Sequence, residues 1–492
     1  MSHPCPAVQL ACAAAALFLA GCASMPPDRG IGEVAALVAA HGDAELGPLL
    51  APPDEAADRA RLAELVAQAL DAGAAVRIAL ANNPRMRQAW ARLGIAQADV
   101  HDAAHLPNPV FGFTDLGPSG GGSPQITRSV GIDLAALLTL APRKRIAAAE
   151  LERIKLEMAD ATLVLAAEAE AAWYEYAGAI QVARMRARVA KAAAISARIA
   201  QRYHDAGNID ARSLALEQAT ATRARIEAAH AEVARTKARA VLAGLLGLRS
   251  SDPWRLVEGL PAPPAQAPGS DLLVDTALAQ RLDLATLRQE LAVLEDGAVF
   301  ARQWRWLGDF ELGYERESKT DGDTLRGPTV SLELPLFDQG QGTTARAQAR
   351  VEEARARLAA AELAARNELV LGIDRLASAQ AIAALYRDAL LPQREAMLAR
   401  TREQANFMFV GVFELIAAQR EQYDAYEAYL GAVRDYWIAK AALRRAAGGR
   451  LPEDTMPPEP TLGVDAVISR PVTVREPGEE DPHRHHPHGD AS

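Results

Sequence analysis

The chain has 492 residues; half of them are hydrophobic, only 5% are aromatic, and the formal net charge is −10. This acidic balance argues against nucleic acid as the main partner, because backbone phosphates are bound by clustered Lys and Arg side chains. A composition rich in alanine and charged residues is typical of long packed helices, and it fits neither a disordered chain nor a compact all-β enzyme.

The first segment of the chain is apolar. From Val8 to Ala20 nearly every residue is hydrophobic, a run too short to span a bilayer but suited to the centre of a signal peptide. We therefore expect residues 1–21 to be a signal peptide. No later stretch approaches about 18 uninterrupted apolar residues, so no transmembrane helix is expected. Any membrane-spanning part would then have to be a β-barrel.

The cysteines all lie in the first 22 residues, at positions 5, 12 and 22. The body of the protein therefore has no thiol for a disulfide, a cysteine-ligated zinc ion or a cysteine nucleophile. Leu19-Ala20-Gly21-Cys22 resembles a bacterial lipobox. That resemblance implies cleavage before Cys22, diacylglycerol on its sulfur and a lipidated segment at 22–61. Ala23 in place of Asp implies sorting to the outer membrane. The alternative is a signal peptide that happens to contain a cysteine.

An internal repeat of about 200 residues organises the rest of the chain. The segment 76–81 (VRIALA) reappears at 274–279 (VDTALA). We therefore expect one unit at 62–252 and a second copy at 270–448. A Pro-rich linker at 253–269 joins them, and the Pro- and Glu-rich tail at 449–492 is expected to be disordered.

Each copy is expected to contain a β-hairpin, at about 109–137 and about 308–337. Apolar and polar residues alternate there, as in Phe310-Glu311-Leu312-Gly313-Tyr314, which predicts strands with one apolar and one polar face. Polar loops rich in Gly, Ser and Asp separate the two strands of each hairpin.

Long helices are expected after each hairpin, at about 143–247 and about 343–447. Leu151, Ile154 and Met158 step by three and four residues, and the same steps recur 200 residues later. Such spacing, with many small alanines, is typical of closely packed coiled-coil helices. We expect Gly207 and Gly411 to break the long helices, because each lies four residues after an aromatic residue and before a returning helix.

This arrangement predicts a tube built from several chains. Four strands cannot close a barrel, and open strand edges do not occur in lipid, so several copies must pool their strands. Helices this long with no globular partner must pack beside one another. The expected fold is therefore mainly α with a small β part: long antiparallel helices form an α-barrel, and four strands contribute to a shared transmembrane β-barrel.

At this point the chain resembles the TolC-like outer-membrane factors, the exit ducts of tripartite efflux and secretion systems. The resemblance is carried by the Ala-Leu-Ala openings of both copies, Asn83-Pro84, the run 334–341 (LPLFDQGQ) and the paired aromatic-x3-Gly turns. The first copy departs from it at 137–142 (LLTLAP), which lacks a matching Phe-Asp segment. The resemblance implies a homotrimer with a twelve-stranded barrel in outer-membrane lipid and a periplasmic helical barrel. It further implies helical tips that dock a periplasmic adaptor (membrane fusion protein), and an RND-type pump in the inner membrane.

The helical turns supply the candidate pore residues. By resemblance, Asp205 and Asp210 could ring the pore at the periplasmic tip and select cations. Asp210 begins the returning helix, and a role as the N-cap of that helix is the favoured alternative for it. Asp205 lies near a helix C-terminus, where the macrodipole disfavours an acid, so it is the better pore candidate of the two. The apolar Phe407 and Phe409 of the second turn would suit an adaptor groove or packing within the trimer.

Histidines supply the candidate metal ligands. His101 and His105 are four residues apart, but no third ligand is near them in the sequence. Four further histidines gather in the tail: His483, His485, His486 and His488. Such a cluster can chelate borderline divalent metals, and the alternative is a solvated tail. Together with an efflux duct, it favours heavy-metal cations as the substrate.

No catalytic motif or phosphate-binding loop is present, so neither an enzyme nor a cofactor is expected. The leading interpretation is a passive channel subunit of an RND-type efflux system that exports metal cations. A multidrug or type I secretion exit duct is the alternative within that class. A periplasmic coiled-coil adaptor or scaffold lipoprotein without a pore is the alternative outside it, although such a protein has no need of a duplicated hairpin.

Overall fold

The computed structural model describes residues 30–42, 46–47, 50, 62–117, 119–264, 274–449 and 451. Two compact units make up the chain, and each takes parts from both copies of the repeat. The first, here called the sheet unit, comprises Met1–Asp54, Pro84–Leu163 and Leu278–Arg366. The second, here called the turn unit, comprises Glu55–Asn83, Val164–Ala277 and Asn367–Ser492.

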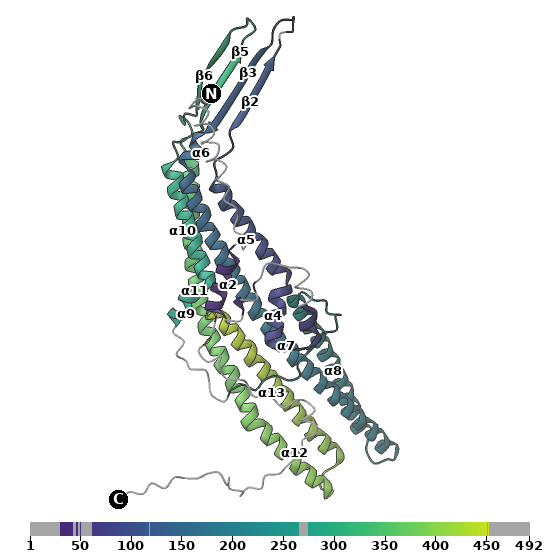
Figure 1. The fold of residues 1–492 in the computed structure, drawn as a ribbon. Coiled ribbons are helices and arrows are strands. Elements are labelled where there is room, and N and C mark those ends of the chain that lie inside the picture. The colour runs from purple at the N-terminus through teal and green to yellow at the C-terminus, as the bar shows by residue number, and fades with distance from the viewer. Residues whose placement is uncertain are drawn as a thin grey trace, which may run out of the picture. The chain divides into compact units, whose positions relative to one another are not determined.

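The sheet unit contains one hairpin from each copy (Figure 1). β2 (Val110–Leu116) and β3 (Gln125–Asp133) form the first, and β5 (Phe310–Ser318) and β6 (Thr324–Leu332) form the second. All pairs are antiparallel, and the strand order is β2-β3-β5-β6, so β3 and β5 join the two copies side by side.

The strand register places the alternating residues on two distinct faces. Phe111 pairs with Val130, Val130 with Tyr314, and Tyr314 with Pro328. Because side chains alternate along a strand, Ile132, Leu312 and Val330 lie on the same face as this row. That face is exposed: the exposed fraction is 66% at Phe111 and 65% at Val330. The expected mainly helical fold with a small antiparallel sheet is therefore confirmed.

Helices complete the sheet unit. They are α2 (Ile31–His41), α5 (Pro84–Ala103), α6 (Leu134–Leu138), α10 (Leu282–Gln303) and the first parts of α7 (Leu140–Asp205) and α11 (Gln341–Leu385). Lys155 of α7 holds α2 in place, since its buried ammonium pairs with Glu33 of α2 and with Glu152 at 2.7 Å. Burial lowers the pKa of Lys155, but its hydrogen bonds to Glu152 and Glu33 outweigh this effect and raise the pKa above its usual value.

The connection between the hairpin and the long helix differs between the two copies. The first copy lacks the Phe-Asp segment that the second copy has at this point. In the first copy the short helix α6 follows β3 directly, capped by the Asp133 carboxylate, which accepts a hydrogen bond from Ala136 N at 3.0 Å. In the second copy Asp338 accepts a hydrogen bond from Gly340 N at 2.9 Å, and Gly340 adopts φ +73° before α11 begins. Residues 334–340 thus form a loop between β6 and α11, and the second hairpin ends at Leu332, before its expected bound at about 337.

The turn unit contains the rest of α7 and α11 with α4 (Ala72–Asn82), α8 (Ala211–Leu246), α12 (Leu391–Asn406) and α13 (Val412–Ala446). A short parallel pair, β1 (Ala69–Leu70) and β4 (Arg255–Leu256), lies beside them, and α9 (Val274–Gln280) begins here. Asn83 is buried, and its side-chain amide donates to Leu245 O at 2.7 Å, which satisfies a carbonyl at the end of α8.

Small and aromatic side chains pack the core of the turn unit. Alanines of α7 and α8 lie against Tyr423, Tyr426 and Leu430 of α13. Tyr174 of α7 stacks on Trp437 of α13 with ring centroids 5.3 Å apart. Because α7 belongs to the first copy and α13 to the second, this core joins the copies of the repeat.

The second copy carries a break that the first lacks. The π-helical turn η2 (Tyr386–Leu390) separates α11 from α12, whose second residue is Pro392. Proline removes one helical hydrogen bond and crowds the preceding turn, and a π-turn relieves that crowding. By length and composition, the helical run Gln341–Asn406 could cross a membrane. This was not predicted from the sequence, because the prediction rested on long uninterrupted apolar runs. An alanine- and leucine-rich bundle helix meets the same criterion.

Candidate functional site: the two helical turns

The first helical turn ends α7 with a Schellman motif. Gly207 N donates to His204 O at 2.8 Å, and Asn208 N donates to Tyr203 O at 2.8 Å. Gly207 adopts φ +75°, a conformation that glycine takes without a steric penalty. Gly207 therefore ends the first long helix as its sequence position predicts.

The second turn uses a different residue for the same task. Met408 N donates to Ala405 O at 3.0 Å, and Phe409 N donates to Gln404 O at 2.9 Å, which repeats the pattern of the first turn. Met408 has φ +60° and is the only non-glycine with positive φ among the described residues. The expectation that Gly411 breaks this helix is wrong: Gly411, with φ −78°, is the N-cap of α13.

The two turns lie together within the turn unit. Tyr203, near the end of α7, contacts Phe413, in the first turn of α13, edge to face with ring centroids 6.0 Å apart. Structural equivalence then runs from Gly207 to Met408 and from Asp210 to Gly411, since the members of each pair hold the same helix-end position. The matching aromatic-x3-Gly spacing of the two turns is therefore coincidental.

Between positions 205–210 of the first turn and 406–411 of the second, acidic side chains occur in the first turn alone. Asp210 caps α8, accepting a hydrogen bond from Ser213 N at 2.8 Å. Hydrogen bonds from the Ser213 side chain and, to a smaller extent, from its backbone hold the pKa of the Asp210 carboxyl below the usual value. The expected N-cap role is thus confirmed. Asp205 is exposed and accepts a hydrogen bond from Gln201 Nε2 at 2.8 Å. The equivalent residues of the second turn are Asn406 and Gly411, which carry no charge.

Apolar side chains come from the second turn. Phe407 and Phe409 lie with ring centroids 6.2 Å apart, and Met408 stands between them in sequence with 92% of its surface exposed. Three large apolar side chains exposed next to one another form a patch of the kind that marks a contact surface. Sequence reasoning identified both phenylalanines but not the backbone conformation of Met408 that presents them.

A charged cluster away from the turns was not predicted. Arg186 of α7 contacts Glu227 of α8 at 3.0 Å, and Asp424 and Glu427 of α13 at 3.0 Å and 2.6 Å. Burial raises the pKa of Glu427, an effect that Arg186 opposes. The guanidinium group of Arg186 thus links α7 to α8 and α13 by pairing with three carboxylates. The residues come from three distant segments, so no spacing in the sequence could reveal the cluster.

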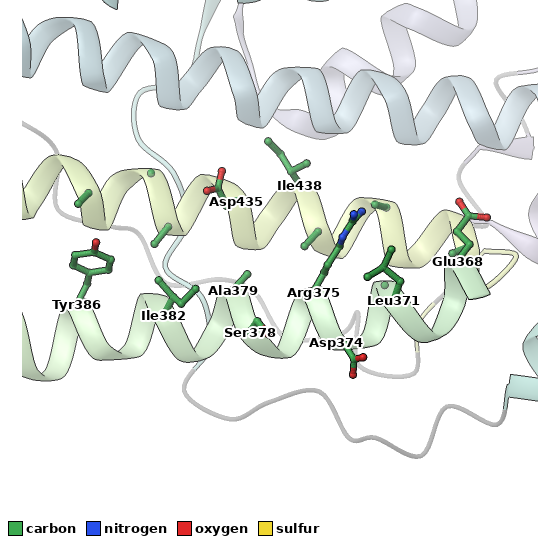
Figure 2. A pocket seen from close by; sticks show the side chains of 17 residues that line it. Glu368, Leu371, Asp374, Arg375, Ser378, Ala379, Ile382, Tyr386, Asp435 and Ile438 are labelled. Atoms are coloured by element: carbon green, nitrogen blue, oxygen red, sulfur yellow. The ribbon is translucent and has the colours of Figure 1, made fainter. Parts of the chain in front are cut away.

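A groove of 810 Å³ lies between α11 and α13 (Figure 2). Figure 2 shows Arg375 directed from α11 toward α13, while Asp374 lies on the other side of α11. At one end of the groove, Glu368 is paired with Arg445 at 2.5 Å. The lining contains neither histidine nor cysteine, so the groove offers no soft metal ligand.

Metal ligands do not gather within the part of the chain that the structure describes: no group of three or more His, Cys, Asp or Glu could hold an ion there. His101 and His105 stack with ring centroids 4.2 Å apart, and His105 Nδ1 contacts His101 O at 2.6 Å. Cys22 and the tail histidines lie outside the described residues, so lipid attachment and metal binding by the tail remain predictions.

Comparisons with known proteins place the fold. No family model matches the chain. Protein CyaE of Bordetella pertussis is 28% identical over 437 residues, 78% of this chain and 86% of that protein. A crystal structure of CusC aligns with a TM-score of 0.61 and 14% identity, covering 77% of this chain and 92% of CusC. The outer-membrane protein VceC of Vibrio cholerae aligns with a TM-score of 0.62 and 17% identity, covering 80% and 97%.

The chain has the fold of the TolC-like outer-membrane factors. The likeness covers more than three quarters of the chain.

Proposed function

We propose that the chain is one subunit of an outer-membrane channel that passively exports substrates from the periplasm to the exterior. The four-stranded sheet carries the proposal. Its apolar face is exposed, and among the described residues no strand pairs with the outer edges of β2 and β6. Open edges are not tolerated in lipid, because their backbone groups would lack partners. Three copies, the number that the family resemblance implies, would close twelve strands into a barrel by pairing β6 of one with β2 of the next.

The helices of the same trimer would form the periplasmic part of the duct. Long alanine-rich helices can pack closely around a lumen, since small side chains let backbones approach. The exposed Phe407, Met408 and Phe409 would then meet a periplasmic adaptor, and an RND-type pump in the inner membrane would supply the energy. A lipid on Cys22 would add an anchor beside the barrel. No catalytic step and no cofactor is needed for passive export.

We further propose that the exported substrates are heavy-metal cations. Asp205 and Asp210 would place six carboxylates at the tip of a trimer, two from each copy. The hydrogen bonds from Ser213 lower the pKa of Asp210, which favours the ionised form of its carboxylate. The tail histidines are of the residue type that binds borderline divalent metals. A multidrug or type I secretion duct remains the alternative, and the acids would then have a structural role only.

Two measurements test the channel itself. The purified full-length chain should run as a heat-sensitive trimer on SDS gels and should conduct in planar bilayers. A monomer that never conducts would contradict the proposal and favour a periplasmic scaffold or adaptor lipoprotein.

For the substrate, a deletion strain should be sensitive to copper, silver, zinc, cobalt or cadmium but not to dyes, detergents and antibiotics. The opposite pattern would make the chain a multidrug exit.

The carboxylates can be tested in the same bilayers. Asp205→Asn should reduce the preference of the pore for cations over anions. Gln201→Glu adds a carboxylate one helical turn from Asp205 and should increase that preference. If neither variant changes ion selectivity while both still conduct, Asp205 does not face the pore.

A further inference from the structure

Charges are sorted by face in the four-stranded sheet. On β5, Arg316 shares a face with Phe310, Leu312 and Tyr314, whereas Glu311, Glu315 and Glu317 point to the other face. The same holds for the other two arginines of the sheet, Arg128 and Arg326. All three arginines therefore lie on the exposed apolar face.

The strand register brings these arginines into one row. Arg128 of β3 pairs directly with Arg316 of β5, and Arg316 pairs directly with Arg326 of β6. Phe113 of β2 completes the row. Neighbouring strands lie about 4.8 Å apart, so the three Cα atoms fall within roughly 10 Å. This set, Arg128, Arg316 and Arg326, is here called the arginine row.

The arginine row lacks anionic partners. All three side chains are exposed, and none forms an ion pair with any residue that the structure describes. The carboxylate that shares their face, Asp115, lies one row nearer the hairpin loops, beside Ile126. Like charges directly opposite each other destabilise a sheet. Three such arginines therefore favour a bound anion that neutralises them.

The position of the row indicates where that anion lies. On one side of it the same face carries apolar residues, including Phe111, Val130 and Tyr314. On the other side a single row remains before β3 and β6 end at Gln125 and Thr324. If the face meets lipid, as the proposed function requires, the arginine row marks the boundary between hydrocarbon and headgroups. Arginine at this depth keeps its stem in the apolar layer and its guanidinium among the headgroups.

We propose that the arginine row binds the phosphate groups of membrane lipids that surround the barrel. The guanidinium group presents a planar fork of donors that matches phosphate oxygens in pairs, which the lysine ammonium does not. The aromatic rings of Phe113 and Tyr314, in and just below the row, would flank the lipid at the interface. This inference rests on the proposed channel function, since only a sheet inserted in a membrane meets such lipids.

The test uses the purified full-length trimer in detergent and follows its dissociation temperature on SDS gels. Bisphosphorylated lipid A should raise this temperature, and lipid A from which both phosphates have been removed should raise it less. The triple variant Arg128→Gln, Arg316→Gln and Arg326→Gln should lose the difference between the two lipids. The triple lysine variant should retain only part of it. Replacing the exposed helix arginines Arg223, Arg225 and Arg350 by Gln is the matched control and should leave the difference intact.

Several outcomes would overturn the inference. Two results would show that the arginine row does not bind phosphate. One is an equal rise of the dissociation temperature with both lipids, and the other is an undiminished difference between the lipids in the triple glutamine variant. An equal shift with inorganic phosphate alone would show that the anion is not a lipid. If the triple variant does not assemble, Arg316→Gln alone, at the centre of the row, should reduce the difference. A wild-type chain that forms no trimer and no conductance defeats the proposed function itself, and this is seen before any lipid is added.

Discussion

Met408 holds in the second helical turn the position that Gly207 holds in the first. Both residues have positive φ, and both donate the backbone hydrogen bond that closes a Schellman motif. A side chain at such a position is disfavoured by about 1–2 kcal/mol, because Cβ crowds the backbone. The second copy therefore accepts strain where the first has none, and that strain presents a methionine between two exposed phenylalanines.

This relationship predicts opposite effects on stability. Gly207→Ala should destabilise the chain by about 1–2 kcal/mol, since no atom surrounds the site to add a clash. Met408→Gly should stabilise it by up to about 1 kcal/mol, the relief being reduced by the greater entropy of unfolded glycine. Thermal unfolding of both variants measures the difference. Equal and small effects of the two changes would mean that positive φ is not a constraint in these turns.

Asp210 predicts a dependence of stability on pH. Its folded-state pKa is lowered by the hydrogen bonds from Ser213, so the stability that it contributes is present above its unfolded pKa and is lost as pH falls through the folded value. Asp210→Ala should lower the melting temperature at neutral pH, whereas Asp210→Ser should lower it less, because serine can also cap a helix. In strongly acidic solution the alanine variant and the wild type should converge. A constant gap across pH would contradict a role for the ionised carboxylate.

Glu427 predicts the reverse dependence. Burial raises its folded-state pKa, so its favourable contribution is present below the unfolded pKa and is lost as pH rises through the folded one. Glu427→Gln should melt with the wild type at about pH 4 and at a higher temperature at about pH 8. Asp424→Asn, at a more exposed partner of Arg186, is the control and should change stability less. If Glu427→Gln melts lower at about pH 8, the ion pair with Arg186 outweighs the burial of the carboxylate.

The two faces of β6 predict a contrast between neighbouring residues. Val330 lies on the apolar face and Ser331 on the other, and both are exposed. In a membrane barrel, a charge at the centre of the lipid-facing surface costs about 2–4 kcal/mol, whereas lumen-facing charges are tolerated. Val330→Arg should therefore abolish heat-sensitive trimers, and Ser331→Arg should leave them intact. Trimers from both variants would argue against contact of this face with lipid.

The local sequence pattern was sufficient to predict the helices and strands, but not which distant segments contact one another. Alternation around Leu312 and Val330 predicted the strands, and three-four spacing around Leu151 predicted the first long helix. The conformation of the Met408 turn was not predicted, because no sequence pattern indicates a methionine with positive φ. The Arg186 cluster and the arginine row were not predicted for another reason: each depends on which distant segments of the chain lie side by side. That pairing is decided by the packing of the whole chain, and no spacing along it records the outcome.

The pairing of β3 with β5 bears on the order of folding. Gln125 of β3 contacts Glu317 of β5 across 192 residues of chain. Closing so large a loop is slow compared with forming helices or hairpins, whose contacts are local. While the polypeptide is being made, the edge of β3 stays unpaired until the second hairpin has emerged. The long helices that lie between the two hairpins, α7, α8 and α10, can form in the meantime, so the four-stranded sheet is completed only after they have emerged.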